Sequence, residues 1–136
     1  MAGTVLVDTG FLVALLSRRD ANHAWASAQL NPLPPPWQTC DAVLSETFYL
    51  LGPNGFSSLS ALMTRGALLS TFRVDDSLEE VLSLMAKYSD IPMSFADACL
   101  VRMTEILSDP TLLTTDSDFR IYRRLGRKAV PIVMPE

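Results

Sequence analysis

Histidine and cysteine are scarce in this chain of 136 residues, which contains one histidine and two cysteines. With His23 as the single histidine, acid–base catalysis by histidine has almost no other candidate. Cys40 and Cys99 lie in different predicted elements, outside any Cys-x-x-Cys or histidine-rich context. The sequence therefore indicates no zinc site and favours two buried free thiols. No serine stands in the Gly-x-Ser-x-Gly context of an activated nucleophile.

Several binding motifs and targeting signals are also missing. There is no Gly-x-Gly-x-x-Gly motif and no P-loop lysine, which argues against a nucleotide-binding protein. The Asp-x-Asp of aspartate-nucleophile phosphatases is absent, since Gly10 follows two residues after Asp8. The most apolar stretch, residues 4–16, is too short to span a membrane, and Asp8 interrupts it. We therefore expect a soluble cytoplasmic protein with no membrane association.

The chain has no excess of positive charge, because its formal net charge is −4. This charge argues against a protein that binds nucleic acid through an overall positive charge. It leaves open a protein that binds phosphate through metal ions. Five of the eleven basic residues fall between Arg120 and Lys128. We interpret this segment as a solvated helix face rather than a phosphate-binding patch.

Short apolar strands alternate with helices along the sequence. We expect strands at 4–7, 37–39, 71–74, 112–114 and 131–133, and helices at 11–17, 20–30, 41–51, 57–69, 77–88, 94–107 and 119–125. This alternation predicts an α/β fold with a mainly parallel sheet. The length favours a single domain spanning residues 1–136.

Acidic residues recur where these strands end and the next helices begin. Asp8 ends the first strand, Glu46 lies in the helix after the second, and Asp97 is in the first turn of the helix at 94–107. Asp116 and Asp118 follow the fourth strand. In a parallel sheet these positions meet at one edge, where carboxylates without basic partners repel one another. Divalent cations bound by oxygen, such as Mg²⁺ or Mn²⁺, are the usual remedy.

Each acid also has a structural interpretation. Asp97 is the third residue after Ser94 and resembles part of a capping box, and Asp116 is suited to cap the helix that follows it. Asp8 is suited to closing a turn with its own backbone. Glu46 lies on an apolar stripe of its helix, so it is either buried with a partner or faces a cleft. The joint placement of the acids favours the functional interpretation.

Four motifs, in order, resemble the PIN-domain nucleases, and most closely the VapC-type toxins of toxin–antitoxin pairs. The motifs are VDTGFLVALL, LSETFYLL, SFADACL and LLTTDSDF, and the likeness runs from Val5 to Val133. It implies a three-layer α/β/α sandwich around a parallel sheet. It also implies an endoribonuclease, dependent on Mg²⁺ or Mn²⁺, that cuts RNA phosphodiester bonds with a metal-activated water.

The resemblance assigns roles to individual residues. The catalytic acids would be Asp8, Glu46, Asp97 and Asp116. Of these, Asp8, Asp97 and Asp116 would hold the metal, and Glu46 would position a water on it. A second tier of residues would orient or assist the acids: Thr9, Thr114 and Asp118. Gly10 stands where the family commonly has Ser or Asn, so a polar contact from that position is missing. His23 is expected to be structural.

The same resemblance implies an RNA substrate, a small antitoxin protein as partner, and a homodimer. The antitoxin would lay a helix in an apolar groove. Leu12, Leu16 and Trp25 are candidates to line that groove, although core positions are the better expectation for them. Two alternatives stay open: a catalytically inactive PIN-like binding or regulatory protein, and a PIN nuclease that processes RNA without being a toxin.

Overall fold

The computed structural model describes residues 3–136. Its strands are β1 (Thr4–Val7), β2 (Trp37–Thr39), β3 (Leu68–Ser70), β4 (Pro110–Leu113), β5 (Arg123–Arg124), β6 (Lys128–Ala129) and β7 (Ile132–Val133). Its helices are α1 (Thr9–Leu16), α2 (His23–Ala28), α3 (Asp41–Thr64), α4 (Leu78–Lys87) and α5 (Phe95–Ile106), with short 3-10 helices η1 (Val74–Ser77) and η2 (Ser117–Arg120).

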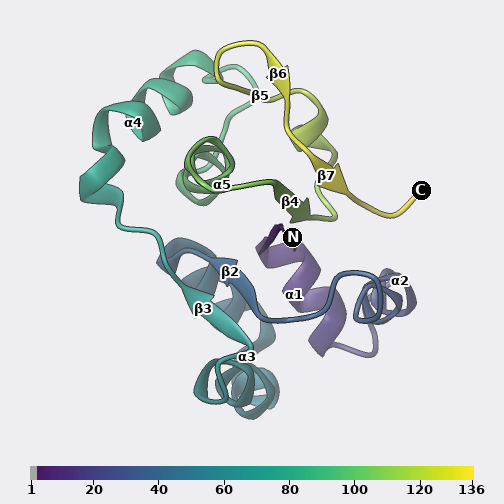
Figure 1. The fold of residues 1–136 in the computed structure, drawn as a ribbon. Helices are drawn as coiled ribbons and strands as arrows, with labels where there is room; N and C mark the ends of the chain where they lie inside the picture. Colours follow the sequence, from purple (N-terminus) through teal and green to yellow (C-terminus); the bar gives the residue numbers. More distant parts are fainter. Residues whose placement is uncertain (1–2) are drawn as a thin grey trace.

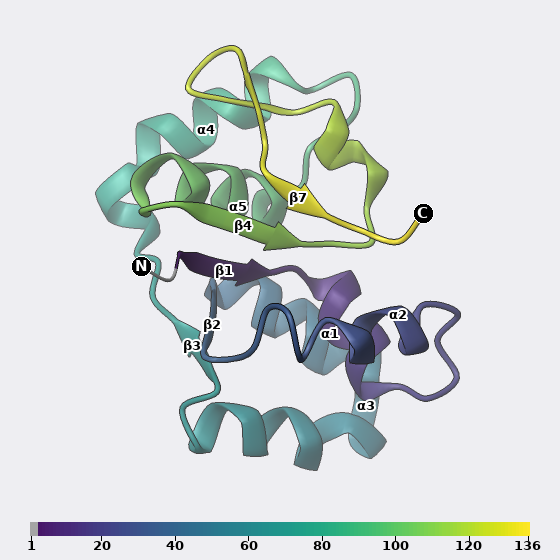
Figure 2. The same cartoon turned by 45° about the vertical axis from the view of Figure 1, so that its right-hand side comes forward.

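Five parallel strands form the central sheet in the order β3-β2-β1-β4-β7. Helices α1, α2 and α3 lie on one side of this sheet, and α4 and α5 lie on the other (Figures 1 and 2). The predicted three-layer α/β/α sandwich with a parallel sheet is therefore confirmed. Across residues 3–136, no helix is long and apolar enough to cross a membrane.

The core is centred on β1 and β4, whose ends Val7 and Leu113 are fully buried. On the α1 side, Phe11 packs edge-on against both Trp25 and Trp37, with ring centroids 5.9 and 5.4 Å away. These aromatic contacts fix α1 on the sheet directly after β1. Among the groove candidates, Leu12 is fully buried, and Leu16 and Trp25 are partly buried against the core. The expectation of core positions is thus confirmed.

The break predicted between the helices at 41–51 and 57–69 is present as a kink at Gly52 inside α3. Gly52 has φ 65° and ψ −164°, a conformation essentially restricted to glycine, and the helix resumes with proline in its first turn. The resumed segment ends at Thr64, where Gly66 with φ 76° reverses the chain. The strand predicted at 71–74 is therefore wrong, because β3 begins earlier and pairs Leu68 with Trp37 of β2.

Two predicted helices are also wrong in extent or type. The helix predicted at 20–30 is shorter, because Asp20 accepts a hydrogen bond from Asn22 N at 2.8 Å and closes a turn before α2. The helix predicted at 119–125 is absent, and η2 leads instead into a hairpin of β5 and β6. Arg123 and Arg124 in this hairpin donate to backbone carbonyls. The interpretation of the basic segment as a helix face is therefore wrong.

The apolar face of α4 also differs from the predicted one. The spacing of leucines and valine predicts Leu78, Val81, Leu82 and Met85 on the inner face of the helix. In the structure Val81 and Leu84 are buried, whereas Leu78 and Leu82 are exposed. The 3-10 helix η1 ends at Ser77, directly before α4, so α4 begins one residue later than predicted.

Candidate active site

The parallel pairing of β1 with β4 brings together the two motifs that end these strands. Val7 is in register with Leu113, and Asp8 N donates to the carbonyl of Leu113 at 3.2 Å. Helix α1 begins directly after Asp8, and η2 begins directly after Asp116. Residues more than a hundred positions apart thus share the carboxyl edge of the sheet, where Figure 2 shows the arrows of β1 and β4 pointing the same way.

All five acids singled out in the sequence line one cavity of about 370 Å³ at this edge. The acidic residues are Asp8, Glu46, Asp97, Asp116 and Asp118. Glu46 is exposed and faces this cavity from α3, which is the second of its two predicted environments. The convergence expected from the positions of the acids at strand ends and helix starts is what the structure shows.

Asp8 is the most buried of these acids, with 5% of its surface exposed. Its Oδ1 accepts a hydrogen bond from Phe11 N at 2.8 Å, so the side chain caps α1. The hydroxyl of Thr114 donates to its other oxygen, Oδ2. Asp8 therefore both caps α1 and lines the acidic cavity.

Thr114 connects two of the acids. Its Oγ1 donates to Asp8 and accepts a hydrogen bond from Asp116 N at 2.9 Å. The Asp116 carboxylate in turn accepts from Asp118 N at 2.9 Å and caps η2. Thr9, which also lines the cavity, donates its hydroxyl to the carbonyl of Val43 at 3.5 Å and so ties the start of α1 to α3.

Asp97 is held by two different contacts. Its backbone N–H donates to Ser94 Oγ at 3.0 Å, which is the cap predicted for α5. Its carboxylate accepts a hydrogen bond from the hydroxyl of Tyr122 at 3.3 Å. Tyr122 is a residue that sequence reasoning missed, because its neighbours in the segment are basic. The available signal was the tyrosine itself, since a buried tyrosine hydroxyl needs a polar partner.

The cavity is strongly acidic because no basic side chain balances its carboxylates. No lysine or arginine lines it, and the ion pairs found within residues 3–136 all lie elsewhere. Burial raises the pKa of Asp8 to about 7, with smaller contributions from the charges of Asp97 and Asp116. Burial and the charge of Asp116 raise the pKa of Asp97 to about 6. A cation bound beside these two carboxylates would lower both pKa values.

The donor set fits a hard divalent cation, because it consists of carboxylate oxygens with hydroxyls and no sulfur or imidazole. Within the part of the chain that the structure describes, 3–136, no three such side chains are already close enough to form a metal site. The side chains therefore fit a divalent cation in their chemistry and charge, but not yet in their spacing. Binding of the ion would require these side chains to move closer together.

His23 has a structural contact. Its Nδ1 lies 2.8 Å from the carbonyl oxygen of Ala14, which joins α2 to α1. The ring is not among the residues that line the acidic cavity. This contact agrees with the structural role expected from the sequence.

The absence of a side chain at Gly10 has a physical reason. A Cβ atom built there would lie 2.1 Å from Thr115 Oγ1. The Thr115 hydroxyl, which lines the acidic cavity, therefore occupies the space that a side chain at residue 10 would need. A polar hydroxyl from another part of the chain thus lies where the side chain of residue 10 would begin, and no local sequence pattern indicates this.

Fold and site together define a class of protein: a parallel α/β/α sandwich with an acidic cavity at the carboxyl ends of its strands. The sequence model of the PIN domain matches residues 5–125. The chain belongs to the PIN domain family.

Among solved structures, the chain is similar to VapC20 of Mycobacterium tuberculosis, which is described as a sarcin-ricin loop cleaving toxin. The TM-score is 0.71 at 24% sequence identity, over 85% of this chain and 92% of that one. At this identity the likeness shows a shared fold. No curated protein sequence matches the chain significantly.

The raised pKa of Asp8 predicts a pH-dependent difference between wild type and Asp8→Asn without metal. In the folded chain the Asp8 carboxyl group stays protonated up to about pH 7, whereas its ordinary pKa is 3.8. The stability that comes from holding this proton in the folded state is therefore fully present below pH 3.8, and it is lost as the pH rises toward 7. At pH 8 we expect Asp8→Asn to be more stable than wild type by roughly 2–4 kcal/mol.

Thermal melts from pH 5 to 8 in a chelator measure this difference, with the exposed Asp90→Asn as a matched control. Curves that stay parallel for wild type and Asp8→Asn across the whole range would contradict the prediction.

The close approach at Gly10 predicts a coupled pair of substitutions. Gly10→Ala should destabilise the fold by about 1–3 kcal/mol, because the new methyl group overlaps the Thr115 hydroxyl. Thr115→Ala removes that hydroxyl, so the double variant should recover most of the loss. Denaturant unfolding of both single variants and the double variant measures the coupling. Losses that simply add would show that the two positions do not compete for one space.

Proposed function

We propose that this chain is a divalent-metal-dependent endoribonuclease that hydrolyses RNA phosphodiester bonds. The observation that carries the proposal is the cavity in which five carboxylates from four separate segments meet without a basic side chain. Besides capping α1, the buried Asp8 carboxylate lies among other acids, and its pKa rises toward neutrality, so its ionised form is unfavourable there without a cation. A cation placed among the acids removes this repulsion and offers a binding point for a phosphate group.

Each acid has a role that follows from its position. Asp8, Asp97 and Asp116 would hold Mg²⁺ or Mn²⁺, and Thr114 keeps the Asp8 carboxylate oriented through its hydrogen bond. Glu46, exposed at the cavity wall, would accept a proton from the attacking water and orient it. When bound, a divalent cation acidifies water and neutralises charge that develops on the phosphoryl oxygens.

The remaining polar residues support this arrangement. Asp118 lines the cavity beside Asp116 and would add negative charge at its edge. Tyr122 donates to Asp97 and limits the orientations of that carboxylate. Thr9 fixes the first turn of α1 against α3, which carries Glu46. These three residues would tune the site without contacting the reacting bond.

We further propose that the protein is the toxin of a toxin–antitoxin pair and acts in the cytoplasm on RNA. The likeness to a toxin that cleaves the sarcin-ricin loop supports this assignment. A surface for a small antitoxin or a second copy is offered by α3, where Tyr49, Leu50 and Phe56 have 85%, 60% and 60% of their surface exposed. The presence of every acid in one cavity favours an active enzyme over the alternative of an inactive PIN-like binding protein.

The nuclease proposal is tested by melting and cleavage assays on wild type, Asp8→Asn, Asp97→Asn and the control Asp90→Asn. Millimolar Mn²⁺ should stabilise wild type and the control, by about 2.7 kcal/mol if the ion is at a hundred times its dissociation constant. The stabilisation should be lost in Asp97→Asn. Cleavage of RNA should fall by more than about 100-fold in Asp8→Asn and Asp97→Asn, because each loses a metal ligand. Full cleavage by an equally pure Asp8→Asn preparation would remove this residue from the mechanism.

The toxin assignment is tested in cells. Induced expression of wild type should arrest bacterial growth, whereas Asp97→Asn at the same protein level should not. Co-expression of a small protein encoded beside the gene should restore growth. Normal growth with an enzyme that cleaves RNA in the tube would favour the non-toxin PIN nuclease.

A further inference from the structure

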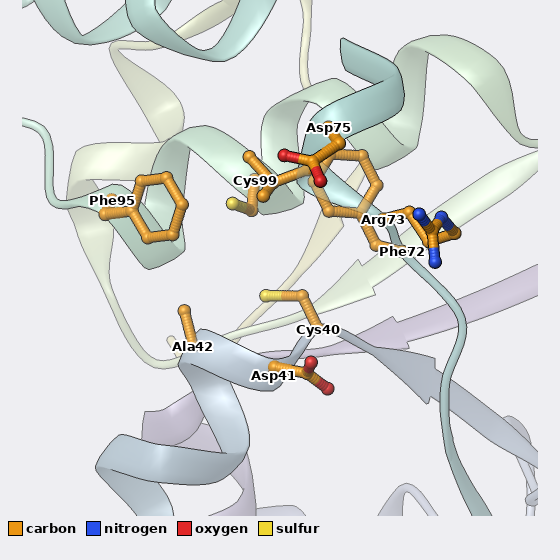
Figure 3. Close-up of a pocket in the computed structure, with 9 residues that line it drawn as sticks. Cys40, Asp41, Ala42, Phe72, Arg73, Asp75, Phe95 and Cys99 are labelled. Carbon is orange, nitrogen blue, oxygen red and sulfur yellow. The ribbon is translucent and has the colours of Figure 1, made fainter. Parts of the chain in front are cut away.

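A second cavity, of about 210 Å³, lies between the start of α3 and helix α5. Its lining includes Cys40, the residue that precedes α3, and Cys99 on α5. Both cysteines are free, and each has only 2% of its surface exposed. Figure 3 shows the two sulfur atoms directed into the same space, between Phe95 and Ala42. The proposed nuclease chemistry uses neither thiol.

The surroundings of Cys40 favour its thiolate. The neighbouring Cys99 thiol lowers the pKa of Cys40, and so do the backbone N–H groups of Val43 and Ala42, while burial opposes them. The thiolate is the form of cysteine that reacts with peroxides. The cavity that Cys40 lines has room for several water-sized molecules, which is enough space for a small oxidant next to the sulfur.

We propose that Cys40 and Cys99 form an oxidisable dithiol, which a hydroperoxide converts into an intramolecular disulfide. In the first step the Cys40 thiolate attacks one peroxide oxygen, the O–O bond breaks, and a sulfenic acid forms while the other oxygen leaves as water or alcohol. In the second step the Cys99 sulfur attacks the sulfenic sulfur, and the S–O bond breaks. The departing hydroxide takes the Cys99 proton as water. Two thiols lose two electrons in total, and the peroxide gains them.

The position of this pair gives the bond a structural consequence. It would tie the first turn of α3 to the first half of α5, and these helices also carry Glu46 and Asp97 of the acidic cavity. Oxidation would therefore set the distance between two walls of that cavity. Formation of the disulfide itself does not depend on the proposed nuclease function.

Hydrogen peroxide is the probe for the test, applied to the pre-reduced, purified protein. We expect wild type to lose both free thiols, to lose the mass of two hydrogen atoms, and to yield one peptide pair linked through Cys40 and Cys99. Dithiothreitol should reverse all three changes. With Cys99→Ser, Cys40 should stop at a sulfenic acid that dimedone traps. With Cys40→Ser, oxidation of Cys99 should be at least tenfold slower.

The wild-type peptide map decides the proposal even if the serine variants fold poorly, and Cys40→Ala and Cys99→Ala provide a second pair of variants. Two thiols that survive peroxide, a gain of oxygen mass without a linked peptide, or a disulfide found only between two chains would each overturn the proposal.

Discussion

The hydrogen bond from Thr114 to Asp8 joins the two ends of the chain at the centre of the sheet, across 106 positions of sequence. It exists only because β1 and β4 pair in parallel with Val7 opposite Leu113. The same hydroxyl accepts from Asp116 N, so the strand pairing also sets where the next acid lies. The relative placement of Asp8 and Asp116 in the acidic cavity thus follows from the register of one strand pair, which the buried side chains of both strands make costly to shift.

A helix-capping role and the proposed catalytic role do not exclude each other for these residues. Asp8 caps α1, Ser94 caps α5 one turn from Asp97, and Asp116 caps η2. In each case a capping contact holds an acid in or beside the first turn of a helix, and the same acid also lines the cavity. Partial positive charge at a helix N-terminus also tolerates an acid there. The fold therefore uses ordinary capping contacts to hold the acids at the edge of the sheet.

The sequence predicted those features that depend on local pattern. β1 and β2 were found at their observed bounds and α5 within a residue or so, because apolar runs and a serine cap mark them. The acids of the cavity were found because strand ends share an edge in parallel sheets. β3 and the β5–β6 hairpin were missed, since partners distant in sequence determine where these strands begin. The hydrogen bond from Tyr122 to Asp97 and the position of Thr115 beside Gly10 depend on tertiary contacts, which spacing in the sequence does not predict.

The charge of the chain bears on how the proposed site would bind a phosphate group of RNA. The chain carries a net charge of −4, and the cavity itself holds five acids, so a phosphate approaching alone meets repulsion. Burial has already raised the pKa of Asp8 and Asp97, which shows how poorly the folded chain tolerates these charges by itself. Within residues 3–136 the acids are not gathered into a ready-made metal site. A cation and a phosphate group would therefore strengthen each other's binding, because each supplies the charge that the other needs.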